Sequence, residues 1–348
     1  MSYPVKHHII VAGASAGGVE ALKTFLKNLP IELNVAVLIV LHIPEHSKSR
    51  LSEILQRETD WKVSLAKDGE TIESNRVYVA GSNAHMLVEN NKIILGKGPK
   101  ENRFRPSIDA LFRSAAYNYR KRVVGILLSG SMDDGNSGLW TVKRLGGITI
   151  VQDVDEALFS QMIMNAKHYV NVDHEVPVAE MGVLLKTILQ ELPESDATDI
   201  SEEEASLIQL EILIAKSDNS FELGILKKGV YTPITCPECF GALVQLKEGN
   251  LVRFRCHTGH AFTISSLMAG ISQGIKDQLW QSMKSMEENA ILLEKLSDTF
   301  QEDGYHEYSL SYSQKAQEYR TKARQVHEII LSHGEFSADP EEFKLDDD

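Results

Sequence analysis

The chain contains little cysteine, no long apolar run and no recognisable secretion signal. Its three cysteines, Cys236, Cys239 and Cys256, lie in one short segment of the 348 residues. An odd number in so narrow a window argues against a disulfide framework and is typical of a metal site in a reducing compartment. Apolar runs such as Val35–Leu41 are too short to span a bilayer. The N-terminus lacks an apolar core followed by a small-residue cleavage site. We therefore expect a cytoplasmic protein without membrane insertion.

Basic residues are fewer than acidic ones, 36 against 49, and the net charge of −13 is unevenly distributed. Residues 1–190 contain 22 Lys and Arg against 20 Asp and Glu, a balance of +2. Residues 191–348 contain 14 against 29, a balance of −15. This contrast indicates two regions with different surfaces. The acidic second half argues against nonspecific binding of nucleic acid, so we expect no nucleic-acid partner.

The first 190 residues alternate short apolar runs with amphipathic segments. Several apolar runs are continuous, as in parallel strands that are buried on both faces. We therefore predict an α/β domain over residues 1–190 with a doubly wound, mostly parallel sheet of the Rossmann-like kind. The expected strands are His8–Ala12, Val35–Leu41, Lys62–Ala66, Arg76–Ala80, Lys92–Leu95, Val123–Ser129 and Gly147–Gln152. The expected helices are Val19–Leu29, Ser49–Glu58, Ser107–Tyr119, Gly138–Leu145 and Val183–Gln190. Within this domain, Arg76–Leu95 is expected to form an antiparallel hairpin around Glu89-Asn90-Asn91.

The second half divides into four segments by composition. Residues 191–206 are polar and acidic and indicate a linker. Residues 207–270 contain the cysteines and are expected to form a small zinc-ribbon module, with Leu207–Ala215 as a possible strand. Residues 271–335 have apolar positions three and four apart, interrupted at Asp303-Gly304, and predict a helical hairpin or short coiled coil. Residues 336–348 form an acidic tail. The hairpin either buries its own seam or docks a second copy or a regulatory partner.

One short motif near the N-terminus bears directly on chemistry. Gly13-Ala14-Ser15-Ala16-Gly17-Gly18 follows an apolar run and precedes an amphipathic stretch, which predicts a strand, a tight turn and a helix. A serine in such a turn is a candidate nucleophile, and the free N–H groups at the helix start can stabilise an oxyanion. Ala16 is the natural backbone donor. Glycine-rich turns also bind phosphates, so nucleotide binding or plain turn geometry are alternatives.

Two further residues follow predicted parallel strands directly. His42 comes after Val35–Leu41, and Asp134 lies in the glycine-rich segment after Val123–Ser129. The carboxyl ends of parallel strands gather the active site of an open α/β sheet, so a serine, a base and an acid are expected to meet there. A histidine at a strand end is more often a capping residue, and an aspartate in such a turn is more often turn chemistry. His46 and Asp133 are competing candidates for base and acid.

The contexts GASAGG, VLHIP and SGSMDDG, in the order Ser, His, Asp, resemble the CheB family of protein-glutamate methylesterases. The resemblance extends from His8 to about Leu189. It includes the segments Tyr78–Gly81, His85-Met86, Arg105–Asp109 and Leu111-Phe112. It implies hydrolysis of methyl esters on glutamates of a methylated receptor protein, often with deamidation of receptor glutamines.

The resemblance also implies residue roles. Ser15 would be the nucleophile, His42 the base and Asp134 the acid, because Asp134 directly precedes Gly135 as in the family. A second backbone donor for the oxyanion would lie near Ser131. No cofactor is expected for catalysis.

The chain departs from the family pattern at two places. Only about seven residues precede the first strand, so the phosphorylated receiver domain of many CheB proteins is expected to be absent in cis. Met162-Ile163 stands where many members have Met-Pro, which puts the shape of that loop in question. Met162, Arg103 and Arg105 are candidate substrate contacts, the two arginines because they can pair with receptor carboxylates.

The cysteine segment predicts a structural zinc site. Cys236 and Cys239 form a C-x2-C knuckle, and Cys256 begins Cys-His-Thr-Gly-His, which ends at His260. Two cysteines from the first knuckle, with Cys256 and one histidine, would complete a tetrahedral Cys3His site with no open position for chemistry. His260 is preferred over His257 because CheB-like proteins with a C-terminal zinc ribbon use this C-x2-G-H spacing. Buried free thiols are the alternative.

The sequence therefore favours a serine esterase of the CheB type joined to a zinc ribbon and a helical hairpin. Two other functions remain open. The domain would serve as a docking scaffold if the triad were not used, or it would act on a different ester or amide.

Overall fold

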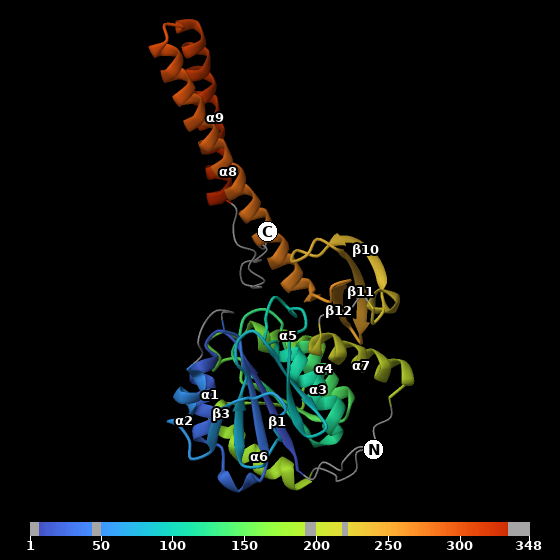
Figure 1. The fold of residues 1–348 in the computed structure, drawn as a ribbon. Coiled ribbons are helices and arrows are strands. Elements are labelled where there is room, and N and C mark those ends of the chain that lie inside the picture. The colour runs from blue at the N-terminus through green and yellow to red at the C-terminus, as the bar shows by residue number, and fades with distance from the viewer. Residues whose placement is uncertain (1–6, 44–49, 192–199, 218–221, 333–348) are drawn as a thin grey trace, which may run out of the picture. The chain divides into compact units, whose positions relative to one another are not determined.

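A computed structural model describes residues 7–43, 50–191, 200–217 and 222–332 (Figure 1). The chain divides into two compact units, residues 1–267 and residues 268–348. The first unit contains the α/β domain and a small antiparallel sheet, and the second contains most of a helical hairpin.

A parallel sheet of seven strands forms the centre of the first unit. Its strand order is β3-β4-β2-β1-β7-β8-β9, and every neighbouring pair is parallel. This confirms the predicted doubly wound α/β fold, to which the structure adds β9. The strands are β1 Ile9–Ala14, β2 Ala36–Leu41, β3 Lys62–Leu65, β4 Arg76–Val79, β7 Val123–Leu127, β8 Ile148–Gln152 and β9 His174–Val176.

Helices cover both faces of this sheet. Ile9 and Val11 of β1 belong to one apolar cluster, and Ile10 and Ala12 belong to a second cluster on the opposite face. Both faces of the strand are therefore buried, which explains its continuous apolar sequence. The first face is covered by α3 Ile108–Tyr119, α4 Asn136–Arg144 and α5 Gln161–Tyr169, and the second by α1 Gly18–Lys27, α2 Leu51–Gln56 and α6 Met181–Glu191. Short 3-10 helices occur at Ile31–Leu33, Arg120–Arg122, Val178–Glu180 and Ile225–Lys228.

The predicted hairpin is only half correct. β5 His85–Glu89 and β6 Lys92–Gly96 pair antiparallel around Asn90 and Asn91. Both asparagines have positive φ, 49° and 60°, as two-residue hairpin turns require. The antiparallel prediction is wrong for Arg76–Val79, because this segment pairs in parallel between β2 and β3.

The possible strand at Leu207–Ala215 is wrong. This segment belongs to helix α7, Glu202–Lys216, which also includes the last residues of the predicted linker. Ser201 and Glu204 form a reciprocal capping box, and the helix packs on α3. The cap and this tertiary contact override the β-like alternation of isoleucines in the sequence. Residues 192–199 of the predicted linker lie outside the described residues.

The cysteine segment forms the predicted small β-rich module. Its antiparallel sheet has the order β10-β11-β12-β13. The strands are β10 Val230–Thr235, β11 Ala242–Glu248, β12 Leu251–Cys256 and β13 Ala261–Thr263. Leu243, Phe254 and Phe262 form a core with the buried cysteines. We call this sheet, with its connecting turns, the ribbon.

The second unit confirms the predicted helical hairpin. Helix α8, Ile264–Glu302, begins seven residues before the predicted boundary at 271, and α9 spans His306–Ser332. Ser297 Oγ donates to the carbonyl of Ser309 at 2.9 Å, and Arg320 pairs with Glu294 at 2.7 Å. The helices therefore pack antiparallel, over a seam that includes the buried alanines 290, 316 and 323. The tail from residue 336 lies outside the described residues. Among the described helices, none has the length and apolarity needed to cross a membrane.

Candidate active site and metal centre

Three neighbouring strands bring together the predicted serine, histidine and aspartate. β1 lies between β2 and β7 in the sheet, with Ala14 opposite Leu41 and Gly13 opposite Leu127. The chain leaves each of these strands at the same edge of the sheet. Ser15, His42 and Asp134 follow those exits, so residues far apart in the sequence meet at one point.

The three side chains form a continuous chain of hydrogen bonds. His42 Nδ1 lies 3.0 Å from Ser15 Oγ, and His42 Nε2 lies 2.7 Å from Asp134 Oδ2. The side chains of His42 and Asp134 are 3% and 1% exposed. A carboxylate only accepts, so Nε2–H donates to Asp134 and the bare Nδ1 faces the serine hydroxyl. His46 lies outside the described residues.

Asp134 lies in a shell of donors. Beyond His42, its carboxylate accepts hydrogen bonds from Ser107 Oγ at 2.9 Å, Asn102 Nδ2 at 2.8 Å and the Ile108 N–H at 2.7 Å. Ile108 is the first residue of α3, so the helix N-terminus also favours negative charge here. Burial by itself raises the pKa of Asp134, but the hydrogen bonds from His42, Asn102 and Ile108 hold it well below its ordinary value. Asp134 is therefore ionised at neutral pH.

Asp133 points elsewhere. Its carboxylate accepts a hydrogen bond at 2.6 Å from Thr263 Oγ1 on the ribbon. Burial raises the pKa of Asp133 to about 6, with a smaller contribution from the charge on Asp134. Of the two adjacent acids, the structure thus places Asp134 and not Asp133 against His42.

The turn that carries Ser15 depends on close packing. Gly17 has φ of 72°, and a Cβ there would lie 2.7 Å from Ser129 Oγ. Gly130 lies against the serine, because an added Cβ would be 3.0 Å from Ser15 Cβ. Ser131 follows Gly130 directly, and Ala16 follows Ser15. Both residues proposed as backbone donors therefore belong to segments that flank the serine.

A pocket of about 390 Å³ opens over Ser15 and His42. Its lining includes Arg103 and Arg105, the two arginines expected to contact substrate. Met162 does not line it: the side chain is fully buried, and its methyl group lies beneath Gly130. The remaining lining residues are Ala16, Ile43, Lys100 and Phe104.

Sequence reasoning missed two residues at this site. The ring of Phe104 stacks on the His42 imidazole, with centroids 3.6 Å apart and planes 6° apart. Asn102 donates to Asp134, as described above. Phe104 lies one residue before the Arg105–Asp109 motif, and this position in the sequence could have marked it as a residue near the site. Nothing in the sequence marks Asn102.

The ribbon brings together the four predicted metal ligands. The ligand atoms of Cys236, Cys239, Cys256 and His260 all lie within 4.8 Å of one another. Cys239 Sγ and Cys256 Sγ are 3.5 Å apart, and His260 Nδ1 is 3.5 Å from Cys256 Sγ. Sulfurs on a tetrahedral zinc, each bonded at about 2.3 Å, lie about 3.8 Å apart. The residues therefore fit a metal ion of this kind.

A parallel α/β sheet with a Ser–His–Asp hydrogen-bonded chain at its carboxyl edge is the arrangement of a serine hydrolase. The chain belongs to the CheB methylesterase family, whose model matches residues 10–185.

Individual relatives agree with this membership. A Leptospira interrogans protein is 35% identical over 181 residues, which covers 52% of this chain and 94% of that protein. The protein-glutamate methylesterase/protein-glutamine glutaminase 1 of Geobacter metallireducens is 37% identical over 177 residues, 50% of this chain and 48% of that protein. The crystal structure of the Thermotoga maritima CheB methylesterase catalytic domain matches with a TM-score of 0.51 and 27% identity, over 53% of this chain and all of that domain. The matches thus cover the α/β domain.

Proposed function

We propose that this protein hydrolyses glutamate methyl esters on a methylated chemoreceptor protein, and deamidates glutamines at such sites, with Ser15 as the nucleophile. The observation that supports this most directly is the chain Ser15–His42–Asp134, with separations of 3.0 and 2.7 Å. The family membership and the pocket over the serine agree with it.

His42 is the base in this mechanism. As Ser15 Oγ attacks the ester carbonyl, Nδ1 accepts the serine proton. The resulting imidazolium is stabilised by Asp134, which stays ionised and keeps the ring oriented through Nε2–H. His42 then gives this proton to the ester oxygen as the bond from carbon to that oxygen breaks, and methanol departs. When the substrate is an amide, the proton goes to the leaving nitrogen, and ammonia departs. A water molecule, deprotonated by His42, hydrolyses the glutamyl-enzyme and releases the carboxylate.

The negative charge that develops on the carbonyl oxygen needs fixed donors. The backbone N–H groups of Ala16 and Ser131 are the proposed donors, because they flank Ser15 on two different turns. Ala16 also precedes the start of α1 at Gly18, where the helix dipole favours a negative charge. Each such donor accounts for roughly 10²- to 10³-fold in rate.

Charge at the pocket favours an acidic substrate. Lys100, Arg103 and Arg105 line the opening, and Arg105 is anchored by hydrogen bonds to Asn83 Oδ1 and the carbonyl of Gly98. Among the described residues, Arg103 forms no ion pair. We assign Arg103 to a carboxylate of the receptor segment beside the reacting glutamate.

The ribbon is proposed to bind one structural Zn²⁺ through Cys236, Cys239, Cys256 and His260. Four protein ligands leave no position for a reacting water, so the ion stabilises the fold and takes no part in hydrolysis. Cys256 and His260 bracket the turn before β13, so the ion fixes where that strand begins.

Methanol release from methylated receptor fragments tests the proposal. Wild type is expected to release methanol, and Ser15→Ala is expected to lose at least 10³-fold in rate while keeping its fold. Ser282→Ala is a matched control, since Ser282 is exposed and bonds to a carbonyl of its own helix. Equal release by Ser15→Ala would refute the role of Ser15. Hydrolysis of small esters but not of receptor would change the substrate class, and binding without any hydrolysis would favour a scaffold.

A further inference from the structure

One loop of the α/β domain, Lys100–Arg105, is built into the ribbon. Glu101 pairs in parallel with Ala261 of β13. The Asn102 N–H donates to the carbonyl of Ala261 at 2.8 Å, and the Ala261 N–H donates to the carbonyl of Lys100 at 3.2 Å. The loop thus forms a parallel β-bridge with β13 at the edge of the ribbon sheet.

The side chain of Asn102 connects the ribbon to the active site. Its Nδ2 donates to Asp134 Oδ1 and to Asp109 Oδ2, both at 2.8 Å. Its Oδ1 accepts from the Thr263 N–H and from Ser266 Oγ, both at 3.0 Å. A backbone N–H can only donate, so the Thr263 contact fixes which end of the amide faces Asp134. The residue is 2% exposed, and both ends of its amide are occupied.

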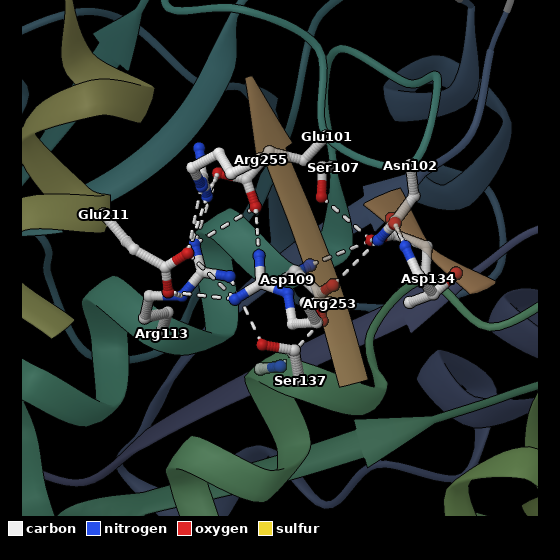
Figure 2. Close-up of polar contacts among 12 residues, drawn as sticks. Glu101, Asn102, Ser107, Asp109, Arg113, Asp134, Ser137, Glu211, Arg253 and Arg255 are labelled. Carbon is white, nitrogen blue, oxygen red and sulfur yellow. Dashed lines mark hydrogen bonds and ion pairs between the residues drawn. The ribbon is translucent and has the colours of Figure 1, made fainter. Parts of the chain in front are cut away.

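The loop is also anchored by buried charge (Figure 2). The Glu101 carboxylate pairs with Arg113 of α3 at 3.1 Å and with Arg255 of β12 at 3.1 Å. Glu211 of α7 pairs with Arg255 at 2.9 Å and with Arg253 at 2.9 Å. These side chains are at most 1% exposed, so the ribbon arginines set the position of Glu101, and with it that of Asn102. Two residues further on, Phe104 stacks on His42.

We propose that Asn102 is a positioning residue that orients the Asp134 carboxylate, and that Thr263 and Ser266 hold Asn102 in its productive rotamer. The ribbon is then part of the support of the active site, and hydrolysis depends on it through this amide. The inference rests on the proposed function of Ser15, His42 and Asp134. A residue that only filled the interior would need no donor aimed at Asp134. It would also need no pair of donors, from Thr263 of β13 and from Ser266 in the first turn of α8, on its carbonyl oxygen.

A double-mutant cycle tests this coupling. Asn102 has φ of 51°, which glycine adopts without strain, so Asn102→Gly removes the amide and spares the backbone. Ser266→Ala removes one of the groups that hold it. Turnover is measured as methanol release per active site, with sites counted by labelling with a fluorophosphonate. Asn102→Gly is expected to lower kcat roughly 10- to 100-fold with little change in KM. Ser266→Ala is expected to lower it roughly threefold.

The coupling is visible in the double variant. If Ser266 acts through Asn102, Ser266→Ala has no further effect on kcat in the Asn102→Gly background. If the losses in kcat of the two single variants add in the double variant, the proposal is overturned. Unchanged kcat per labelled site in Asn102→Gly would also overturn it, because a purely structural role lowers the number of labelled sites and not the kcat of each site. Asn102→Asp keeps the acceptor for Thr263 but places a carboxylate beside Asp134, so it should be at least as impaired as Asn102→Gly. Ser282→Ala is the matched control.

The wild type and Ser15→Ala are run in parallel. Loss of activity in Ser15→Ala together with full activity in Asn102→Gly would overturn only the role of Asn102. Activity in Ser15→Ala would instead remove the proposed function on which the inference rests.

Discussion

Replacing Glu211 by glutamine tests whether buried charge joins the ribbon to the α/β domain. Glu211 lies on α7, is 1% exposed, and forms ion pairs with three arginines. Its partners are Arg113 of α3 and Arg253 and Arg255 of β12. Attraction to these arginines holds the pKa of Glu211 well below its ordinary value, although burial alone raises it. Glutamine keeps the shape but removes the negative charge.

The expected loss is large because three positive charges stay buried. Glu101 and Glu248 are then the carboxylates left beside them in the cluster. Breaking a buried charge network from one side costs about 3–5 kcal/mol in the free energy of unfolding. For a unit of this size, each kcal/mol lowers Tm by about 2–4 °C, so Tm should fall by roughly 6–20 °C.

Glu204→Gln is the matched control on the same helix. Glu204 pairs with Arg144 at 2.7 Å, but both side chains are about one-third exposed. Glutamine retains the capping-box geometry, so the cost should stay below about 1 kcal/mol.

The assay is urea unfolding followed by circular dichroism and by tryptophan fluorescence. Of the three tryptophans, Trp140 lies in α4 beside the Gly249 turn of the ribbon. A cost under about 1 kcal/mol for Glu211→Gln would refute the reasoning. Unfolding of the ribbon separately from the α/β domain in both wild type and variant, with the same unfolding transition of the α/β domain in both, would also refute the reasoning.

Two further predictions concern a buried acid and the metal site. Burial raises the pKa of Asp133 from 3.8 to about 6. Between about pH 4 and pH 6 the folded protein therefore keeps a proton that the unfolded chain releases. As pH rises through this range, the Asp133 carboxyl lowers the free energy of unfolding. Asp133→Asn replaces the carboxylate by an amide whose oxygen still accepts from Thr263 but carries no charge. This variant should raise the free energy of unfolding by about 1–3 kcal/mol at pH 7 and should have no such effect below about pH 4. An equal gain at both pH values would contradict the raised pKa of Asp133. Cys239→Ser should reduce the zinc content, measured by mass spectrometry, from about one ion per chain to well below one. It should also lower Tm and the methanol release per labelled site. Full zinc content in the variant would contradict the proposed ligands.

The sequence by itself determined the parts of this protein that depend on local pattern. Continuous apolar runs predicted the parallel strands, and the glycines around Ser15 predicted the strand-to-helix turn. The spacing of Cys236, Cys239, Cys256 and His260 predicted the cluster. The apolar positions three and four apart in residues 271–335 predicted the helical hairpin. Each of these signals lies within one continuous segment of the chain, where side-chain periodicity, residue spacing and backbone preference act directly.

Only the tertiary structure decided which distant groups meet. Glu101 and Arg255 are 154 positions apart, and Asp133 and Thr263 are 130 apart. No local pattern encodes such pairs, because they arise when one sheet packs against another. The helix at Glu202–Lys216 has the same origin, since its packing on α3 overrides a strand-like sequence. The position of Asn102 between Asp134 and Thr263 follows from that packing, because burial requires each of its polar atoms to find a partner.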